Sequence, residues 1–149
     1  WARGVSVPSH LNLLYREEER ERIPFGEDQK SAITPYSPLA SGRLTRDWTG
    51  DTKRSLTDQT SKMKYDQTMD QDRVIVERVA QVAEELDVKR AQVALAWLMQ
   101  KEVVTVPIIG ATKESHLLDA LPAIDVTLTP EQVAFLEEPY LPHQVVGAR

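Results

Sequence analysis

The sequence predicts an α/β fold in which βα units are arranged around a parallel sheet. Three observations lead to this prediction. Apolar segments with the character of strands occur at residues 4–12, 32–36 and 103–109, and apolar residues at helical spacing lie between the second and the third of them. The last strand candidate runs directly into Gly110 and a helix start at residues 112–114. Strands that alternate with helices in this way are typical of parallel sheets.

The first third of the chain predicts short elements. The apolar alternation at residues 4–12 is interrupted by Pro8, which lacks the N–H group that a ladder hydrogen bond needs, so the strand should be short. Residues 12–23 are strongly charged, and the acidic run at residues 17–21 indicates a solvated helix face. A brief strand at residues 32–36 should end in the turn-rich segment that follows it.

Residues 43–72 have hardly any apolar periodicity, and a long structureless segment in a compact domain is usually functional or disordered. The segment is locally basic within an acidic protein. We therefore interpret it as a loop that covers an anionic cofactor, and a solvated insertion is the alternative that the composition leaves open. Its basic residues up to position 64 are Arg43, Arg46, Lys53, Arg54, Lys62 and Lys64, and Asp47, Asp51 and Asp58 oppose them.

The second half predicts regular helices. Asp72 can cap a helix whose apolar positions run from residue 75 to residue 86, and Asp87 tolerates the left-handed turn that ends it. The next helix, at residues 91–98, is apolar on nearly all sides and should be well buried. The last helix should begin at Thr129, because residues 129–132 form a capping box with proline at the first helical position.

The turn at Gly110 has the sequence of an anion-binding site. Glycine lets the backbone approach a ligand closely, the first N–H groups of a helix lack partners within the helix, and Lys113 supplies a mobile positive charge. A phosphate group suits such a turn. A purely structural turn with a solvated Lys113 is the alternative.

Composition narrows the class of protein. Lys and Arg number 18 and Asp and Glu number 23, and the net charge of −5 argues against a nucleic-acid-binding protein. No apolar run approaches the roughly 20 residues that span a bilayer, so we expect no membrane partner. The absence of cysteine excludes disulfides and thiolate sites and favours the cytoplasm. Because the chain opens with Trp1 and its methionines lie far downstream, we expect a piece of a longer protein.

The histidines and tryptophans indicate structural roles. His10 and His143 are far apart and have no partner at metal-ligand spacing, so we expect no metal site and assign them to the surface or the core. Trp48 should anchor its loop. Trp97 lies on the apolar helix and should belong to the core.

Three segments together resemble a known family. They are PYSPLASGRLTRDW at residues 35–48, AQVALAWL at 91–98 and VPIIGATKESHL at 106–117. They resemble the C-terminal half of the aldo-keto reductases, and most closely the bacterial branch related to potassium-channel β subunits. The resemblance extends from Trp1 almost to the C-terminus. It implies that the chain, residues 1–149, carries about the last three βα units of an eight-stranded TIM barrel.

The resemblance also implies a site for NADP. Tyr36 falls where the family stacks an aromatic ring on the nicotinamide, and the loop after it wraps the pyrophosphate. Gly110, Thr112 and Lys113 fall at the site for the phosphate on the adenosine ribose, and His116 and Asp119 near the adenosine. The implied cofactor-binding residues are Tyr36, Ser37, Leu39, Ser41, Arg43, Gly110, Thr112, Lys113, His116 and Asp119.

The family's catalytic Asp, Tyr, Lys and His come from the first half of the barrel, so the resemblance places none of them in this chain. Two positions depart from the family pattern. Pro8 stands where relatives have a Gln that holds the nicotinamide carboxamide, and Lys89 stands where they commonly have a Thr or Ser helix cap. The cap change should cost about 1 kcal/mol.

Two hypotheses follow. In the first, the chain is a fragment of an NADP-dependent oxidoreductase, and a complete barrel containing it reduces an aldehyde or ketone. In the second, it is an inactive nucleotide-binding or interaction module, a truncated remnant. In either case we expect no turnover by the isolated chain, and self-association through strand edges that lack a partner.

Overall fold

The computed structural model describes residues 4–48 and 59–145. Two strands, β1 (Ser6–His10) and β2 (Ala32–Tyr36), pair in parallel along their whole length, from Ser6 opposite Ala32 to His10 opposite Tyr36. Both predicted short strands are therefore confirmed. The helix between them, α1 (Arg22–Asp28), packs closely against β2 at Gly26, where an added Cβ would lie 2.3 Å from the Ile33 side chain.

The third predicted strand, at residues 103–109, is wrong as a continuous buried strand. Only two parallel bridges form, from Ile33 to Val104 and from Tyr36 to Ile108. Pro107 has no N–H to donate, and Ile108 instead donates to the carbonyl of Pro35 at 2.7 Å. Between the bridges this segment advances by four residues while β2 advances by three, which is a bulge. Ile108 remains 52% exposed.

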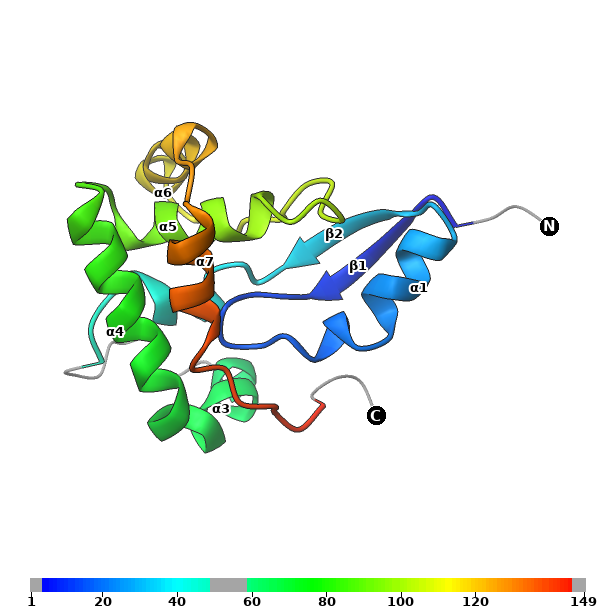
Figure 1. Ribbon diagram of the computed structural model, residues 1–149, viewed down its shortest axis with the longest axis horizontal. Helices are drawn as coiled ribbons and strands as arrows, with labels where there is room; N and C mark the ends of the chain where they lie inside the picture. The colour runs from blue at the N-terminus through cyan, green and yellow to red at the C-terminus, as the bar shows by residue number, and fades with distance from the viewer. Residues whose placement is uncertain (1–3, 49–58, 146–149) are drawn as a thin grey trace.

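The helices lie mainly beyond the carboxyl ends of the strands (Figure 1), whereas α1 lies beside the sheet. The helices after β2 are α3 (Gln59–Tyr65), α4 (Met69–Glu85), α5 (Arg90–Met99), α6 (Glu114–Ala120) and α7 (Pro130–Glu137), with 3₁₀ turns at Glu17–Glu19, Ala40–Thr45, Asp66–Thr68 and Leu121–Asp125. The long helix α4 packs against α5 and α7.

The helical predictions for the second half are largely confirmed. All residues from Val93 to Leu98 of α5 are buried, including Trp97. Asp87 has the left-handed conformation, with φ of 53°. Helix α7 begins as predicted, because the Thr129 hydroxyl accepts from the N–H of Gln132 at 3.2 Å, and the Gln132 side chain accepts from the N–H of Thr129.

Two predictions about charged residues are wrong. Asp72 is not a helix cap: Thr68 precedes α4, and Asp72 lies buried within the first turn. The acidic run is not wholly a solvated face, because Glu17 is only 7% exposed. Its carboxylate is enclosed by the segment that follows α7, which returns to the start of the chain. Both carboxylates can be buried because local donors and donors from the segment after α7 satisfy their charges.

The segment at residues 43–72 is more ordered than its sequence predicts. Residues 59–72 are helical, in α3, a 3₁₀ turn and the start of α4. Tyr65 of α3 is fully buried and attaches this helix to the core. A single buried residue produces no periodic pattern in the sequence. Lys53 and Arg54 lie outside the described residues. Within the described ranges, no helix combines the length and apolar character that a membrane span requires.

Candidate functional site

A cavity of about 1150 Å³ lies at the carboxyl end of β2, between the loop that follows it, the turn at Gly110 and the facing ends of α4, α5 and α6. This is the end of a parallel sheet at which α/β proteins bind ligands. Seven of the ten residues that the resemblance implied line the cavity. They are Tyr36, Ser37, Leu39, Ser41, Gly110, His116 and Asp119.

The loop after β2 carries an unusual concentration of left-handed backbone. Ser37, Ala40 and Ser41 have φ of 55°, 48° and 57°, and Gly42 follows at 86°. Only glycine adopts this region without steric cost, and each strained residue costs on the order of 1–3 kcal/mol. Such strain concentrates at ligand sites. The loop is held by backbone hydrogen bonds from Ala40 to Ser37 and from Gly42 to Leu39.

Gly110 leaves open space on the wall of the cavity. A Cβ added there would meet nothing within 4 Å, and the residue is exposed. Packing within the chain therefore does not require glycine at this position, whereas close approach by a ligand would. Helix α6 begins at Glu114 with Lys113 before it, which agrees with the predicted turn. Lys113 and Thr112 are exposed and are not among the residues that line the cavity.

The charges around the cavity are mostly paired. Arg90 and Asp47 form an ion pair at 2.7 Å, and Lys89 of the α5 N-terminus pairs with Asp119 of α6. Arg46 lines the cavity and makes no ion pair with the part of the chain that the structure describes. An anionic ligand would therefore meet Arg46 directly, and would compete with Asp47 and Asp119 for the other two cations.

Arg43 is directed into the protein. Its guanidinium pairs with Asp66, and its side chain is 11% exposed. It lies 5.6 Å from the ring centroids of both Trp48 and Tyr65. The Trp48 indole donates to the carbonyl of Arg43 at 2.9 Å, so Trp48 anchors its loop as predicted. The assignment of Arg43 to the cofactor stays a prediction.

Behind Tyr36 lies a buried stack of rings. His10 stacks on Tyr15 at 4.2 Å and on Tyr36 at 5.2 Å, and it is fully buried. Its Nε2 is 2.8 Å from the hydroxyl of Tyr65. Burial, with a contribution from the charge of Lys64, lowers the pKa of His10 to about 3, so the imidazole is neutral.

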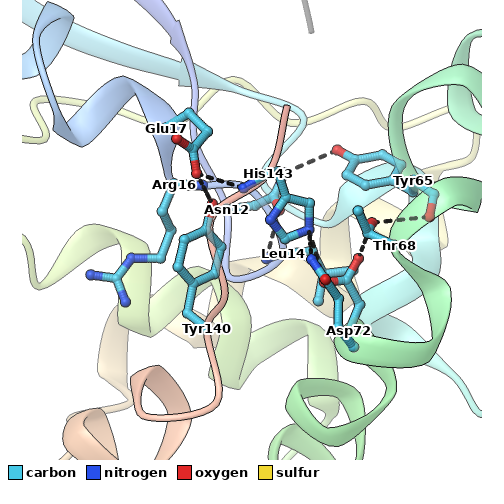
Figure 2. Close-up of polar contacts among 10 residues, drawn as sticks. Asn12, Leu14, Arg16, Glu17, Tyr65, Thr68, Asp72, Tyr140 and His143 are labelled. Carbon is cyan, nitrogen blue, oxygen red and sulfur yellow. Dashed lines mark hydrogen bonds and ion pairs between the residues drawn. The ribbon is translucent and has the colours of Figure 1, made fainter. Parts of the chain in front are cut away.

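A second buried cluster holds the segment after α7 (Figure 2). Glu17 accepts hydrogen bonds from the Tyr140 hydroxyl and the His143 backbone N–H, each at 2.8 Å. His143 donates from Nε2 to Asp72 at 3.0 Å, and both side chains are at most 2% exposed. Asp72 also accepts from the Thr68 hydroxyl at 2.6 Å. Every carboxylate in this cluster therefore has hydrogen-bond donors from other elements.

The protonation of this cluster follows from its contacts. Burial opposes the charged imidazolium of His143, but the hydrogen bond and charge of Asp72, together with Glu17, raise the pKa of His143 above its usual value. Burial also opposes the charge of Glu17. The donors from His143 and Tyr140, with Arg20, outweigh it and lower the pKa of Glu17. Relative to the unfolded chain, folding therefore favours the protonated form of His143 and the charged form of Glu17.

The cluster around His143 is not arranged for nucleophilic catalysis. The Thr68 hydroxyl contacts the Asp72 carboxylate, and Asp72 in turn contacts the His143 imidazole. Because the hydroxyl does not contact the imidazole, His143 cannot take the hydroxyl proton as a general base would. In the described parts of the chain, no group of three or more His, Asp or Glu side chains is placed to hold a metal ion. The chemistry that the site supports is binding at the cavity.

A cavity beside a strained loop and a glycine turn, at the carboxyl end of parallel strands, defines an α/β protein with a ligand site at the end of its sheet. More particularly, the chain belongs to the aldo/keto reductase family, whose model matches residues 1–140. The family fold is the (β/α)₈ barrel, and the parallel strands and helices described above are consistent with part of one.

Relatives agree with this assignment. A candidate aryl-alcohol dehydrogenase of Saccharomyces cerevisiae is 37% identical over 97% of this chain and 42% of its own length. The versiconal hemiacetal acetate reductase of Aspergillus parasiticus is 35% identical over 97% of this chain and 43% of its own. An aldo-keto reductase of Fusarium vanettenii is 36% identical over 99% and 40%. The chain spans about two fifths of the length of these relatives.

Proposed function

We propose that this chain is the C-terminal part of an NADP-dependent aldo-keto reductase. In a complete barrel, it would contribute to hydride transfer between NADPH and an aldehyde or ketone. The observation that carries this proposal is the cavity, because it gathers seven of the ten implied cofactor residues from three separate segments. The C-terminal placement, the link to the bacterial branch and the cytoplasmic location stay predictions.

Each part of the cavity has a role in this proposal. Tyr36 would stack on the nicotinamide, and the left-handed loop from Ser37 to Gly42 would follow the pyrophosphate. The open space at Gly110 admits a phosphate, with Lys113 and Arg46 as the nearby cations. His116 and Asp119 would border the adenosine. The bound NADPH would supply the hydride, and this chain would bind and orient it.

The alternative proposal is a binding or interaction module without chemistry. Exposed apolar side chains favour it: Val106 is 53% exposed and Ile108 is 52% exposed beside the two bridges, and Leu118 and Ile124 are exposed on α6 and the turn after it. Such surfaces favour association. We therefore also propose that the isolated chain self-associates, and sedimentation velocity over a range of concentrations would measure it.

The central test is a comparison of NADPH and NADH binding by the chain and by its Lys113→Glu variant. Charge reversal at the proposed 2′-phosphate site should weaken NADPH binding by about tenfold, or about 1.4 kcal/mol, and NADH binding much less. Nicotinamide fluorescence during titration measures both. Lys30→Glu is the matched control, because Lys30 is exposed and precedes β2 at the opposite end of the sheet.

The outcomes test whether the cavity is an NADPH site. A selective loss of NADPH binding in Lys113→Glu, with Lys30→Glu unchanged, supports the reductase assignment. Equal losses for NADPH and NADH contradict the role of Lys113. Saturable binding without any carbonyl reduction is expected for the isolated chain, and turnover above a heat-denatured sample would contradict that expectation.

A further inference from the structure

The ring of Tyr36 is held from behind by His10. The two residues are partners in the parallel register of β1 and β2, so their side chains project to the same side of the sheet. Their rings are 5.2 Å apart and nearly parallel, at 10°. On the other side of His10, Tyr15 stacks at 4.2 Å and 17°. His10 and Tyr15 are both fully buried, so the stack begins in the core and ends at the cavity.

A hydrogen-bond network fixes the orientation of the imidazole plane. Asn12 donates from Nδ2 to the Tyr65 hydroxyl at 3.1 Å and to the carbonyl of Ser37 at 2.9 Å. Since the Tyr65 oxygen accepts from Asn12, its own proton is free to go to Nε2 of His10 at 2.8 Å. The same network therefore connects the His10 imidazole to Tyr65 of α3 and, through Asn12, to Ser37, which follows Tyr36.

A histidine is a costly choice for this position. With Nε2 as the acceptor, the neutral ring carries its proton on Nδ1, which is buried and has no hydrogen-bond partner. An unpaired buried donor destabilises the fold. A phenylalanine would fill the same stack without that cost. What histidine adds is the bond to Tyr65, which restrains rotation of the ring about its Cβ–Cγ bond.

We propose that His10 is a positioning residue that holds the ring of Tyr36 in the orientation that receives the nicotinamide. This inference rests on the proposed function of the cavity. In this proposal α3 also helps to place the Tyr36 ring. Its Tyr65 contacts His10, and the Nζ of its Lys64 lies 5.2 Å from the centroid of the Tyr36 ring. The residue acts through Tyr36 and does not itself touch the cavity.

The test compares two ligands in the full chain and in His10→Leu. NADPH carries the nicotinamide, and adenosine 2′,5′-bisphosphate lacks it. Loss of the stack should raise the Kd for NADPH about fivefold, which corresponds to about 1 kcal/mol, and leave the Kd for the bisphosphate unchanged. His10→Phe keeps the stack and loses the bond to Tyr65, so its NADPH affinity should lie between the two. His143→Leu is the control for loss of a buried histidine elsewhere.

A second readout does not depend on the cofactor. In chain labelled with ¹³C in its tyrosine rings, the ring-flip rate of Tyr36, followed at the signal assigned with Tyr36→Phe, should rise in His10→Leu and stay the same in His143→Leu. His10→Phe, which lacks the bond to Tyr65, should give a smaller rise and serves as the test if His10→Leu does not fold.

Equal losses for both ligands, or an unchanged ring-flip rate read from the Tyr36 signal, would overturn the proposal. If the unaltered chain binds neither ligand, the proposed function of the cavity fails. The Tyr36 signal alone then decides whether His10 positions the ring.

Discussion

The wall of the cavity and the cluster around His143 handle charge in opposite ways. At the cavity, Lys89 and Asp119 are 61% and 47% exposed and their pair is open to solvent. In the cluster, His143 and Asp72 are at most 2% exposed, and each carboxylate has several donors. Exposed pairs can be exchanged for a ligand at little cost, whereas a buried pair cannot be opened without unfolding its surroundings. The first region is suited to binding and the second to holding the chain together.

The largest effect should come from removing one partner of the buried pair. Asp72→Ala leaves the buried His143 side chain without its carboxylate partner and also removes the acceptor of the Thr68 hydroxyl. The free energy of unfolding should fall by about 3–5 kcal/mol, as measured by urea denaturation. Replacing both partners in Asp72→Leu with His143→Leu should recover much of that loss, because no unpaired charge remains.

The exposed pair at the cavity supplies the control for this comparison. Asp47→Ala breaks the ion pair with Arg90, in which Asp47 is 65% exposed. The expected change is below about 1 kcal/mol. Similar losses for Asp47→Ala and Asp72→Ala would mean that burial does not separate the two regions.

The two buried histidines should give opposite pH dependences. The pKa of His143 is raised by folding, so its contribution to stability is complete below pH 6.5 and is lost as the pH rises through the folded value. The pKa of His10 is lowered to about 3, so its contribution is complete above pH 6.5 and is lost as the pH falls. Between pH 6.5 and 4.5 the loss through His10 should be about 1.4 kcal/mol per pH unit.

Urea denaturation from pH 4.5 to 8.5 measures both slopes. His10→Phe should remove the loss on the acid side, and His143→Phe should remove the loss on the alkaline side. The pKa of Glu17 is lowered, so its contribution to stability is complete above pH 4.5 and does not change across this range. If both variants changed the same side of the profile, one of the two protonation states would be wrong.

Much of the fold could be predicted because its determinants are local. The capping box at Thr129, the left-handed Asp87 and the apolar run from Val93 to Leu98 each depend on neighbouring residues. The cavity was also predictable in large part, because Tyr36 and Gly110 each end a strand segment that reaches the same edge of the sheet. Strand ends that share an edge meet in space whatever their separation in sequence.

The buried clusters were not predictable, because their partners are distant in the sequence. Glu17 meets His143 across 126 residues, and His10 meets Tyr65 across 55. In sequence, Glu17 cannot be told from Glu18 and Glu19, which are less completely buried. Likewise, residues 103–109 have the composition of a strand. They do not form a continuous strand because their register against β2 shifts by one residue at Pro107.

The smallest change in stability is expected at Lys89. This residue precedes α5 and lies on the wall of the cavity, so it could serve either the fold or the ligand. Its side chain cannot accept a hydrogen bond, so the start of α5 has only the half of a capping box in which Gln92 accepts from the Lys89 N–H at 3.1 Å. Lys89→Thr should add a cap that contributes about 1 kcal/mol and remove an exposed pair of at most about 1 kcal/mol. The net change in stability should therefore lie within about 1 kcal/mol and favour the variant.

Freeing Asp119 should meanwhile weaken binding of any anionic ligand. Stability, measured by urea denaturation, should therefore rise while the affinity for NADPH, measured by titration, falls. If both moved together, Lys89 would be a structural residue and the wall of the cavity would not differ in kind from the buried cluster.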